Sequence, residues 1–406
     1  MLSFDEAIAA ILNEVEPRPA VEVSLDGSLG LVLAADITCD VDSPPFDKSQ
    51  MDGFAVRATD TSNAPTTLHV IEELTAGNVP QRTVGPGQAT RIMTGAPMPE
   101  GADAVVPIEQ CDFAEGSDSV TVNSSPHSGA YVIGRGASMV KGETVLSAGT
   151  PLTAASMGLL AELGQARVPV FPRPMVGILA TGDELVPVDE SPGPGQIRNS
   201  NQTMLVAQVA NTGAEPRPLG IARDERGDLK SKIAQGLECD VLCLSGGVSA
   251  GKLDLVPSEL EAAGVRQVFH KVNVKPGKPV WFGRLDADRS PDGRPRWIFG
   301  LPGNPVSSMV CFELFVRTAL RRLMGITPEE PPTITVRLET PHSTRGDRPT
   351  YFPARLRWTV EGARVTPVNW QGSFDLRATA GANSMIAFPA GERVFDKDDP
   401  VEVIAW

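Results

Sequence analysis

Residues 241–249 read Val-Leu-Cys-Leu-Ser-Gly-Gly-Val-Ser, an apolar run that ends in a pair of glycines. A short, continuous apolar run is typical of a strand buried on both faces of a parallel sheet. The same order of strand, glycine-containing loop and helix is found at residues 175–211 and 297–323. We predict strands at residues 175–180, 241–244 and 297–299, and helices around residues 202–211, 229–235 and 306–323. This alternation predicts an α/β domain, which we place between residues 172 and 326.

The segments on either side of this domain have other patterns. Near the start of the chain, Ser3 and Glu6 have the spacing of a capping box, and helical periodicity follows until Pro17. A further helix is predicted at residues 153–163, and an alternating pattern in the last part of the chain predicts a small β-barrel or sandwich. Between the first helix and residue 149 the sequence favours short strands, at residues 68–74, 88–93, 104–108 and 119–123.

The bulk composition limits the partners of this protein. The chain has 406 residues and a formal net charge of -14, which repels nucleic acid and anionic membranes. Its five cysteines have no zinc-ligand spacing, and their odd number, with no secretory leader, indicates a reducing compartment. No apolar stretch approaches the ~20 residues of a membrane helix. We therefore expect a cytoplasmic protein that binds neither nucleic acid nor membrane.

Two glycine-rich loops follow strands of the predicted α/β domain. The first comprises residues 245–249, Ser-Gly-Gly-Val-Ser, in which glycines free backbone amides for an anion-binding nest. The second comprises residues 301–305, Leu-Pro-Gly-Asn-Pro, before a long helix whose N-terminus favours phosphate. Either loop alone is equally well explained as a tight turn. Because both follow strands of one domain, where open α/β sheets bind ligands, we predict a site for a phosphate-bearing small molecule.

Charged side chains lie close to these loops in the sequence. Lys275 and Lys278 belong to a Lys-Pro-Gly-Lys-Pro turn that the prolines stiffen, and we favour anion binding over a solvated surface role. Glu184 follows a Thr-Gly turn, and Asp254 lies just past the first glycine loop. Carboxylates beside a phosphate site most often hold Mg²⁺, although Asp254 is alternatively a helix N-cap.

Two further candidate site residues have roles that the sequence alone leaves open. Asp52 belongs to an Asp-Gly turn and Thr94 to a Thr-Gly-Ala-Pro run, and either could be a turn residue or a site residue. No arrangement of His, Cys or Ser residues suggests a catalytic nucleophile. The residues therefore predict phosphoryl or nucleotidyl handling by a metal and by positioning, rather than covalent catalysis.

Taken in order, these motifs resemble those of the molybdopterin molybdenumtransferases, the family of the bacterial MoeA proteins and of the E domain of gephyrin. The resemblance covers essentially the whole chain. It rests on six collinear motifs, at residues 45–57 (Pro-Phe-Asp-Lys-Ser-Gln-Met-Asp-Gly-Phe-Ala-Val-Arg), 91–97 (Arg-Ile-Met-Thr-Gly-Ala-Pro), 181–185 (Thr-Gly-Asp-Glu-Leu), 245–249, 275–279 and 300–307 (Gly-Leu-Pro-Gly-Asn-Pro-Val-Ser).

This resemblance implies a reaction and a fold. Adenylylated molybdopterin and molybdate would give molybdenum cofactor and AMP, with Mg²⁺ required. The fold would be multidomain α/β plus β, with elongated N-terminal helical and β-rich subdomains, a three-layer, MogA-like α/β subdomain that binds molybdopterin, and a small C-terminal β-barrel. The four subdomains would comprise residues 1–50 with 135–171, 51–134, 172–326 and 327–406.

The resemblance also implies a homodimer whose active cleft lies between the subunits, with Asp52 and Thr94 supplied by the partner chain. A molybdopterin adenylyltransferase and molybdoenzymes would be further partners. The implied catalytic residues are Asp52, Thr94, Glu184 and Asp254, of which Glu184 and Asp254 would also bind the metal. The implied contacts to the pterin nucleotide are Ser245, Gly246, Gly247, Ser249, Pro302, Gly303, Asn304 and Pro305. The implied contacts to oxyanions, molybdate included, are Lys275, Lys278, Ser307, Arg348 and Ser373.

One position departs from the family pattern, because Ser138 stands where an acidic residue is usual. Two alternative functions stay open. The first is a molybdopterin adenylyltransferase, whose fold resembles the α/β subdomain alone, and the second is a non-catalytic dimeric scaffold. Acidic residues at Asp52, Glu184 and Asp254 favour an enzyme.

Overall fold

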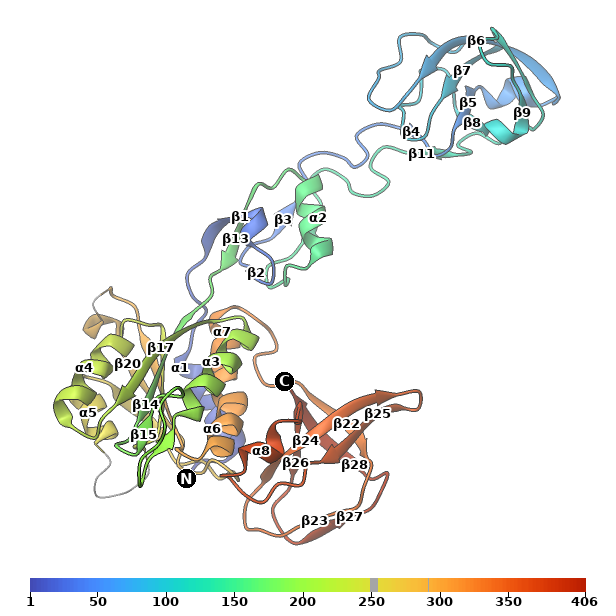
Figure 1. The fold of residues 1–406 in the computed structure, drawn as a ribbon. Helices are drawn as coiled ribbons and strands as arrows, with labels where there is room; N and C mark the ends of the chain where they lie inside the picture. Colours follow the sequence, from blue (N-terminus) through green and yellow to red (C-terminus); the bar gives the residue numbers. More distant parts are fainter. Residues whose placement is uncertain (249–254, 291) are drawn as a thin grey trace. The chain divides into compact units, whose positions relative to one another are not determined.

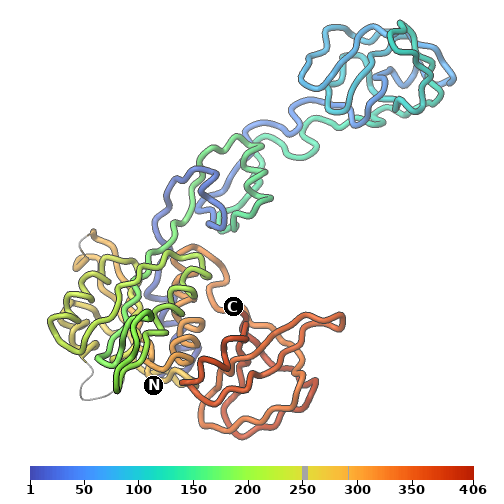
Figure 2. The backbone as a smooth tube through the Cα atoms, in the orientation of Figure 1, coloured from blue at the N-terminus to red at the C-terminus, as the bar shows by residue number. Residues whose placement is uncertain are grey.

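The computed structural model describes residues 1–248, 255–290 and 292–406. The chain forms two compact units. Unit 1 comprises residues 1–34, 149–154 and 167–406, and unit 2 comprises residues 35–148 and 155–166. The chain leaves unit 1 after residue 34, returns to it for residues 149–154 and returns finally at residue 167. Figure 2 traces this backbone path by colour. The four subdomains expected from the family divide the chain more finely than these two units, and their boundaries stay a prediction.

A six-stranded sheet forms the centre of unit 1 (Figure 1). Four of its strands are parallel and adjacent, in the order β17 (Glu215–Ala222), β14 (Met175–Thr181), β18 (Val241–Ser245) and β21 (Arg296–Leu301). Two antiparallel strands, β20 (Trp281–Leu285) and β19 (Arg266–His270), complete the sheet. The strands predicted at residues 175–180, 241–244 and 297–299 are confirmed, each slightly longer than expected.

Strand β17 was not predicted, and its sequence explains why. It contains Pro216 and Pro218, which have no N–H to donate to a neighbour. Such residues are tolerated at the edge of a sheet, and β17 is the edge strand next to β14. The two prolines exclude a strand in the middle of a sheet, but they are compatible with the edge position of β17.

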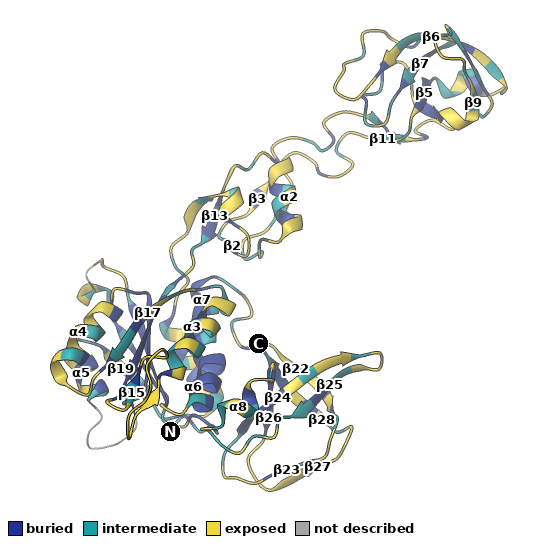
Figure 3. Cartoon of the chain, viewed as in Figure 1, coloured by how far each residue is buried: buried dark blue, intermediate teal, exposed yellow. Residues whose placement is uncertain are grey.

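Helices cover both faces of the sheet, and side chains alternate between the two layers. In β18, Cys243 packs with one apolar cluster and its neighbours Leu242 and Leu244 pack with the other. The first cluster includes residues of α1 (Phe4–Glu14), α3 (Ser200–Thr212), α6 (Pro305–Cys311) and α7 (Arg317–Leu323). The second includes residues of α4 (Arg226–Gly236) and α5 (Val256–Ala262). Strands β14, β18 and β21 and helix α6 consist mainly of buried residues, as the colouring by burial in Figure 3 shows for α6. The predicted three-layer α/β architecture is confirmed.

Local sequence signals set the helix ends. In the capping box before α1, the Glu6 N–H donates to Ser3 Oγ at 3.1 Å and the Ser3 N–H donates to Glu6 Oε2 at 2.7 Å. Helix α3 ends at Gly213, whose φ of 92° lies in the left-handed region that favours glycine. The long helix predicted at residues 306–323 is interrupted, because a π-helical turn at Phe312–Val316 separates α6 from α7.

The last part of the chain, from residue 333 onward, forms the predicted small barrel. Its five strands close in the order β22 (Thr333–Leu338), β25 (Gly362–Pro367), β24 (Thr350–Thr359), β26 (Ser384–Phe388) and β28 (Pro400–Ala405). Two shorter strands, β23 (His342–Thr344) and β27 (Arg393–Phe395), pair with each other, and α8 (Leu376–Thr379) follows β25. The inward-facing side chains of the strands form a separate apolar core.

Unit 2 is built around a second six-stranded sheet, which contains the four strands predicted there. Their order is β8 (Ala104–Pro107), β5 (Gly53–Val56), β7 (Gln88–Ile92), β6 (Thr66–Leu74), β10 (Ser119–Val122) and β9 (Cys111–Asp112). Two short pairs, β4 (Lys48–Ser49) with β11 (Val132–Ile133) and β3 (Ile37–Thr38) with β12 (Thr144–Leu146), join the segments that enter and leave this sheet. Helix α2 (Ala154–Glu162) confirms the helix predicted at residues 153–163.

A third small sheet belongs to unit 1. It pairs β13 (Arg167–Phe171) with β1 (Val21–Ser24) on one side and with β2 (Val32–Leu33) on the other. Among the described residues, no helix is long and apolar enough to cross a membrane.

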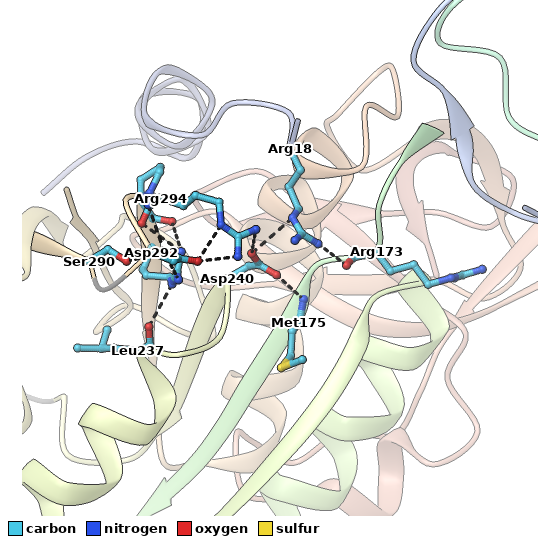
Figure 4. Close-up of polar contacts among 10 residues, drawn as sticks. Arg18, Arg173, Met175, Leu237, Asp240, Ser290, Asp292 and Arg294 are labelled. Atoms are coloured by element: carbon cyan, nitrogen blue, oxygen red, sulfur yellow. Dashed lines mark hydrogen bonds and ion pairs between the residues drawn. The ribbon is translucent and has the colours of Figure 1, made fainter. Parts of the chain in front are cut away.

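A polar cluster lies where the strands of the α/β sheet begin, at the edge opposite to their carboxyl ends (Figure 4). Asp240 is buried there, and its carboxylate accepts a hydrogen bond from the Met175 N–H at 2.8 Å and pairs with Arg18 Nε at 3.4 Å. Arg18 also donates to the Arg173 carbonyl at 2.5 Å. The cluster therefore connects the segment that follows α1 and the segment that precedes β14 to the sheet itself.

Replacing Asp240 with alanine is expected to destabilise unit 1 by about 3 kcal/mol, because the half-buried Arg18 guanidinium loses its charge partner and the Met175 N–H loses its acceptor. Urea unfolding followed by tryptophan fluorescence measures this loss. Glu238→Ala is the matched control, since Glu238 pairs with Arg217 at 3.0 Å on the surface. Both partners of that pair are exposed to water, so its loss should destabilise the protein far less than the loss of Asp240. Equal destabilisation by the two variants would contradict the structural role of Asp240.

Candidate functional site

A cleft of about 780 Å³ lies at the carboxyl ends of β14, β18 and β21. This is the edge where parallel α/β sheets bind ligands, and the volume is that of an ordinary small-molecule site. The cleft brings together most of the predicted pterin-nucleotide contacts, namely Ser245, Gly246, Gly247, Pro302, Gly303, Asn304 and Pro305, with Glu184 and Ser307. Ser249 and Asp254, which were also predicted here, lie outside the described residues.

The first glycine loop needs glycine for two reasons. Gly246 and Gly247 have φ angles of 97° and 66°, in the left-handed region that other residues rarely adopt. In addition, a Cβ atom on Gly246 would lie only 2.7 Å from the Thr181 carbonyl oxygen. The Gly246 N–H donates to the Leu301 carbonyl at 3.1 Å, which fixes the loop to the neighbouring strand. The backbone of this loop therefore lies close against β14 and is hydrogen-bonded to β21.

The second glycine loop connects β21 to α6 and also contacts the barrel. Asn304 is the N-cap of α6, and Pro305 occupies its first turn. The Val306 N–H donates to the Ser373 carbonyl at 3.0 Å, and Asn304 Nδ2 donates to Ser373 Oγ at 2.8 Å. One N–H at the start of this helix is thus used to bind the barrel loop rather than being left for an anion. These two hydrogen bonds place Ser373 beside the start of α6, although Ser373 itself does not line the cleft.

Asn201 connects the two glycine loops and was not among the predicted site residues. Its Nδ2 group donates to Ser245 Oγ at 2.7 Å and to the Gly303 carbonyl at 2.8 Å. Because Ser245 Oγ accepts this hydrogen bond, the Ser245 hydroxyl keeps its own proton to donate to a ligand. The helix containing Asn201 was expected to begin at residue 202, whereas it begins at Ser200 after the N-cap Asn199. The cap residue was the signal that would have placed Asn201 at this edge of the sheet.

Replacing Asn201 with alanine is expected to slow the reaction in this cleft about tenfold or more, because both loops lose a shared anchor and small displacements of reacting groups are costly. Asn201→Asp should be worse, since a carboxylate oxygen would then face the Gly303 carbonyl. Steady-state rates with a thermal-melting check measure the effect. Gln202→Ala on the same helix is the control, because Gln202 does not line this cleft. An unchanged rate in Asn201→Ala would contradict the anchoring role.

Carboxylates in the cleft fit a magnesium ion that is shared with a phosphate ligand. Glu184 is exposed, lines the cleft and folds back over Gly182, so that a Cβ on that glycine would lie 2.3 Å from Glu184 Oε2. Asp224 lines the cleft as well. In the described part of the chain, no group of three or more His, Cys, Asp or Glu side chains is arranged to hold a metal. Mg²⁺ needs only one or two carboxylates when phosphate oxygens and water complete its coordination, so the donors present suit that ion.

Basic residues gather beside the cleft. Lys275 and Lys278 are exposed, while Pro276 and Gly277 between them are buried against α6, where Cys311 Sγ donates to the Gly277 carbonyl at 3.4 Å. The turn therefore presents both ammonium groups from a fixed backbone. Neither lysine lines the cleft, to which the turn contributes Pro279.

The barrel adds a third cation to this basic turn. Arg348 Nη1 donates to the Val274 carbonyl at 3.3 Å, next to Lys275. The Lys275 backbone itself pairs with the barrel, since its N–H donates to the Pro349 carbonyl at 2.9 Å and its carbonyl accepts from Tyr351 N–H at 2.7 Å. Lys275 and Arg348 thus lie together where the α/β domain meets the barrel, with Lys278 in the same turn as Lys275.

Asp52 and Thr94 lie together in unit 2. Asp52 Oδ1 accepts hydrogen bonds from both the N–H and the hydroxyl of Thr94, each at 2.7 Å. The hydrogen bond from the Thr94 backbone, followed by that from its side chain, lowers the pKa of Asp52 below its ordinary value. Asp52 is therefore a carboxylate at neutral pH. Asp52 and Thr94, 42 positions apart in the sequence, thus form a hydrogen-bonded pair. From the sequence alone, the role of each residue was ambiguous.

Comparisons with known proteins agree along the whole chain. Residues 2–164 match the profile of the MoeA N-terminal region (domain I and II), residues 177–322 that of a probable molybdopterin binding domain, and residues 335–406 that of the MoeA C-terminal region (domain IV). A molybdopterin molybdenumtransferase from Bacillus subtilis is 36% identical over 99% of this chain and 94% of its own. Molybdopterin molybdenumtransferase 2 from Mycobacterium tuberculosis is 37% identical over 100% of this chain and 98% of its own.

A solved structure agrees as well. The crystal structure of a molybdopterin biosynthesis MoeA protein from Pyrococcus horikoshii superposes with a TM-score of 0.83 at 30% identity, covering 100% of this chain and 99% of that one. The resemblance inferred from the six motifs is thereby confirmed, and with it the fold class. The chain belongs to the molybdopterin molybdenumtransferase family, whose bacterial members are the MoeA proteins.

Proposed function

We propose that this protein is a transferase that inserts molybdenum from molybdate into adenylylated molybdopterin and releases AMP, in the biosynthesis of the molybdenum cofactor. The observation that carries this proposal is the cleft itself, in which two glycine loops, tied together by Asn201, stand beside a junction of three basic residues. The first feature suits a phosphate-bearing nucleotide and the second suits a tetrahedral oxyanion. Family membership along the full chain supports combining the two in one reaction.

We assign each residue a proposed role from its position in or beside the cleft. Ser245, Gly246 and Gly247 contact the phosphates of the adenylylated pterin through the hydroxyl and the backbone, and residues 302–305 contact them from the opposite loop. Lys275, Lys278, Arg348, Ser307 and Ser373 hold molybdate. The bond broken is the phosphoanhydride between the pterin phosphate and AMP, and the oxygen of a water molecule adds to phosphorus as AMP leaves. Molybdenum forms bonds to the two pterin sulfurs, and one molybdate oxygen leaves as water with the two thiol protons, so that the overall reaction balances.

Magnesium belongs to this proposal as the required cofactor. Glu184 would hold it, with Asp254 as the second carboxylate expected from the family. When bound, the ion neutralises negative charge on the phosphate oxygens. Removing the divalent cation with a chelator should therefore suppress AMP release, and readdition of Mg²⁺ should restore it.

We further propose that the active unit is a homodimer in the cytoplasm, in which Asp52 and Thr94 reach the cleft from the partner chain. The Asp52 carboxylate is charged and exposed, which suits a group that acts on a ligand held elsewhere. Partners upstream and downstream would be a molybdopterin adenylyltransferase, which supplies the substrate, and molybdoenzymes, which receive the product.

The proposal is tested by incubating the protein with adenylylated molybdopterin and Mg²⁺, with and without molybdate, and measuring AMP. Molybdate should stimulate AMP release. The competing adenylyltransferase function predicts pyrophosphate from ATP and molybdopterin instead, so a parallel assay with those two substrates separates the alternatives. Pyrophosphate formation without molybdate-stimulated AMP release would overturn the proposal.

A further inference from the structure

An exposed aromatic side chain forms part of the cleft wall and has no role in the chemistry described so far. Phe374 is 67% exposed and lines the cleft beside Asn304 and Pro305. Leaving a phenyl ring in water forgoes about 2 kcal/mol of the stabilisation that burial would give. The ring faces a site of ligand size, which is where an exposed apolar group most often has a function.

The loop that carries Phe374 is fixed by hydrogen bonds on both sides of the ring. Before it, Ser373 is held by the Val306 N–H at 3.0 Å and by Asn304 Nδ2 at 2.8 Å. After it, the Asp375 N–H donates to the Gly372 carbonyl at 2.9 Å, and the Asp375 carboxylate accepts from the Ala378 N–H at 3.2 Å as the cap of α8.

Glycine at position 372 makes room for the ring. A Cβ atom there would lie 3.2 Å from Phe374 Cε1, and the φ of 151° disfavours other residues. The Gly372 carbonyl also accepts a hydrogen bond from Trp370 Nε1. The backbone that carries Phe374 is therefore tied to the second glycine loop through Ser373, which sets the point of attachment of the ring beside the phosphate-binding groups.

We propose that Phe374 stacks against a fused heterocyclic ring of the ligand, so that one end of the ligand is held by the glycine loops through its phosphate and the other by this aromatic face. The inference rests on the proposed function, because both adenylylated molybdopterin and AMP combine phosphate with a flat ring. Stacking is tolerant of ring identity, since every such heterocycle has a π-face. Adenine and pterin are the two rings that this substrate offers.

The test measures equilibrium binding by calorimetry for wild type, Phe374→Ala, Phe374→Leu and Phe374→Trp. AMP, molybdopterin and sodium molybdate are the three probes. Phe374→Ala should lower the affinity for the ligand whose ring stacks by about fivefold to tenfold, and it should leave the affinity for molybdate unchanged. Phe374→Leu should lose most of the same affinity because it keeps apolar area but no π-face, and Phe374→Trp should restore it. The probe that responds, AMP or molybdopterin, identifies the ring.

Trp358→Ala is the matched control, since Trp358 is 77% exposed on β24 of the same barrel and does not line the cleft. It should bind all three probes like wild type. Unchanged AMP and molybdopterin affinities in Phe374→Ala would overturn the stacking proposal, as would an equal loss of molybdate binding, which would indicate a displaced loop. These outcomes differ from failure of the proposed function, in which the wild type itself would bind neither heterocycle.

Discussion

Replacing Gly246 with alanine is expected to reduce molybdate-stimulated AMP release by about a hundredfold or more. The new Cβ would lie 2.7 Å from the Thr181 carbonyl oxygen and 3.0 Å from Thr181 Oγ1. Thr181 is buried at the end of β14, an interior strand of the sheet, so it cannot move away. The loop must move instead, and it must also leave a φ of 97° that alanine rarely adopts. A displacement of about 1 Å of groups that position a substrate costs on the order of 100-fold in rate.

Gly227→Ala is the control for this change. Gly227 lies in α4 of the same domain, and a Cβ there would have no atom within 4 Å. Alanine in a helix is more stable than glycine by about 0.5–1 kcal/mol, so this variant should melt at a slightly higher temperature and keep full activity. If Gly246→Ala bound AMP and turned over like Gly227→Ala, the first glycine loop would have no part in ligand binding.

Replacing Asp52 with asparagine is expected to reduce AMP release by about a hundredfold, while binding of the substrate to the α/β cleft persists. Asparagine keeps the oxygen that accepts the two Thr94 hydrogen bonds, so the local fold of unit 2 should be unchanged. Only the negative charge is lost, and a misplaced or missing charged group at a reacting centre costs on the order of 10² to 10³ in rate. Full activity in Asp52→Asn would remove this carboxylate from the mechanism and favour a scaffold role.

The stabilisation that the Asp52 carboxylate gives to unit 2 depends on pH in a definite direction. Because the Thr94 hydrogen bonds lower the pKa of Asp52, their stabilisation is present above the ordinary Asp pKa of about 3.9 and is lost as the pH falls through the lower, folded-state value. Asp52 therefore stays charged from pH 5 to pH 8. The rate of AMP release measured between pH 5 and pH 8 should therefore show no titration of Asp52, and an active Asp52→Glu variant should have the same pH profile as the wild type.

The two variants together test the shared cleft. If each site takes its glycine loop from one chain and Asp52 from the other, a mixed dimer of Gly246→Ala and Asp52→Asn contains one intact site and one doubly altered site. Coexpression should then restore about a quarter of wild-type activity, since half of randomly paired dimers are mixed. Purified mixed dimers without any restored activity would place Asp52 and the glycine loop of the same chain in one site.

The strand and loop pattern was the part of this fold that the sequence predicted best. The apolar run that ends at Ser245 could be interpreted because a strand buried on both faces excludes polar residues. The edge strand β17 could not, since two prolines argue against a strand unless its place at the edge is known. The interruption at Phe312–Val316 left no visible break in the apolar periodicity of the long helix.

The sequence pointed to candidate site residues that lie within one loop. It did not point to those whose place in the site depends on contacts between separate elements. Lys275 and Lys278 belong to a single turn, so their proximity is local. Asn201 acts by joining Ser245 to Gly303, a contact between three elements that periodicity does not reveal. Phe374 depends on how the barrel packs against α6, which only the folded chain shows.

The most direct test of the central claim is to measure AMP and pterin-bound molybdenum from one reaction of this protein with adenylylated molybdopterin, Mg²⁺ and molybdate. Molybdenum insertion coupled to adenylate cleavage predicts that the two products appear together in equal amounts, and that both fall in Gly246→Ala. Release of AMP without molybdenum in the pterin product would show a simple hydrolase and contradict the account.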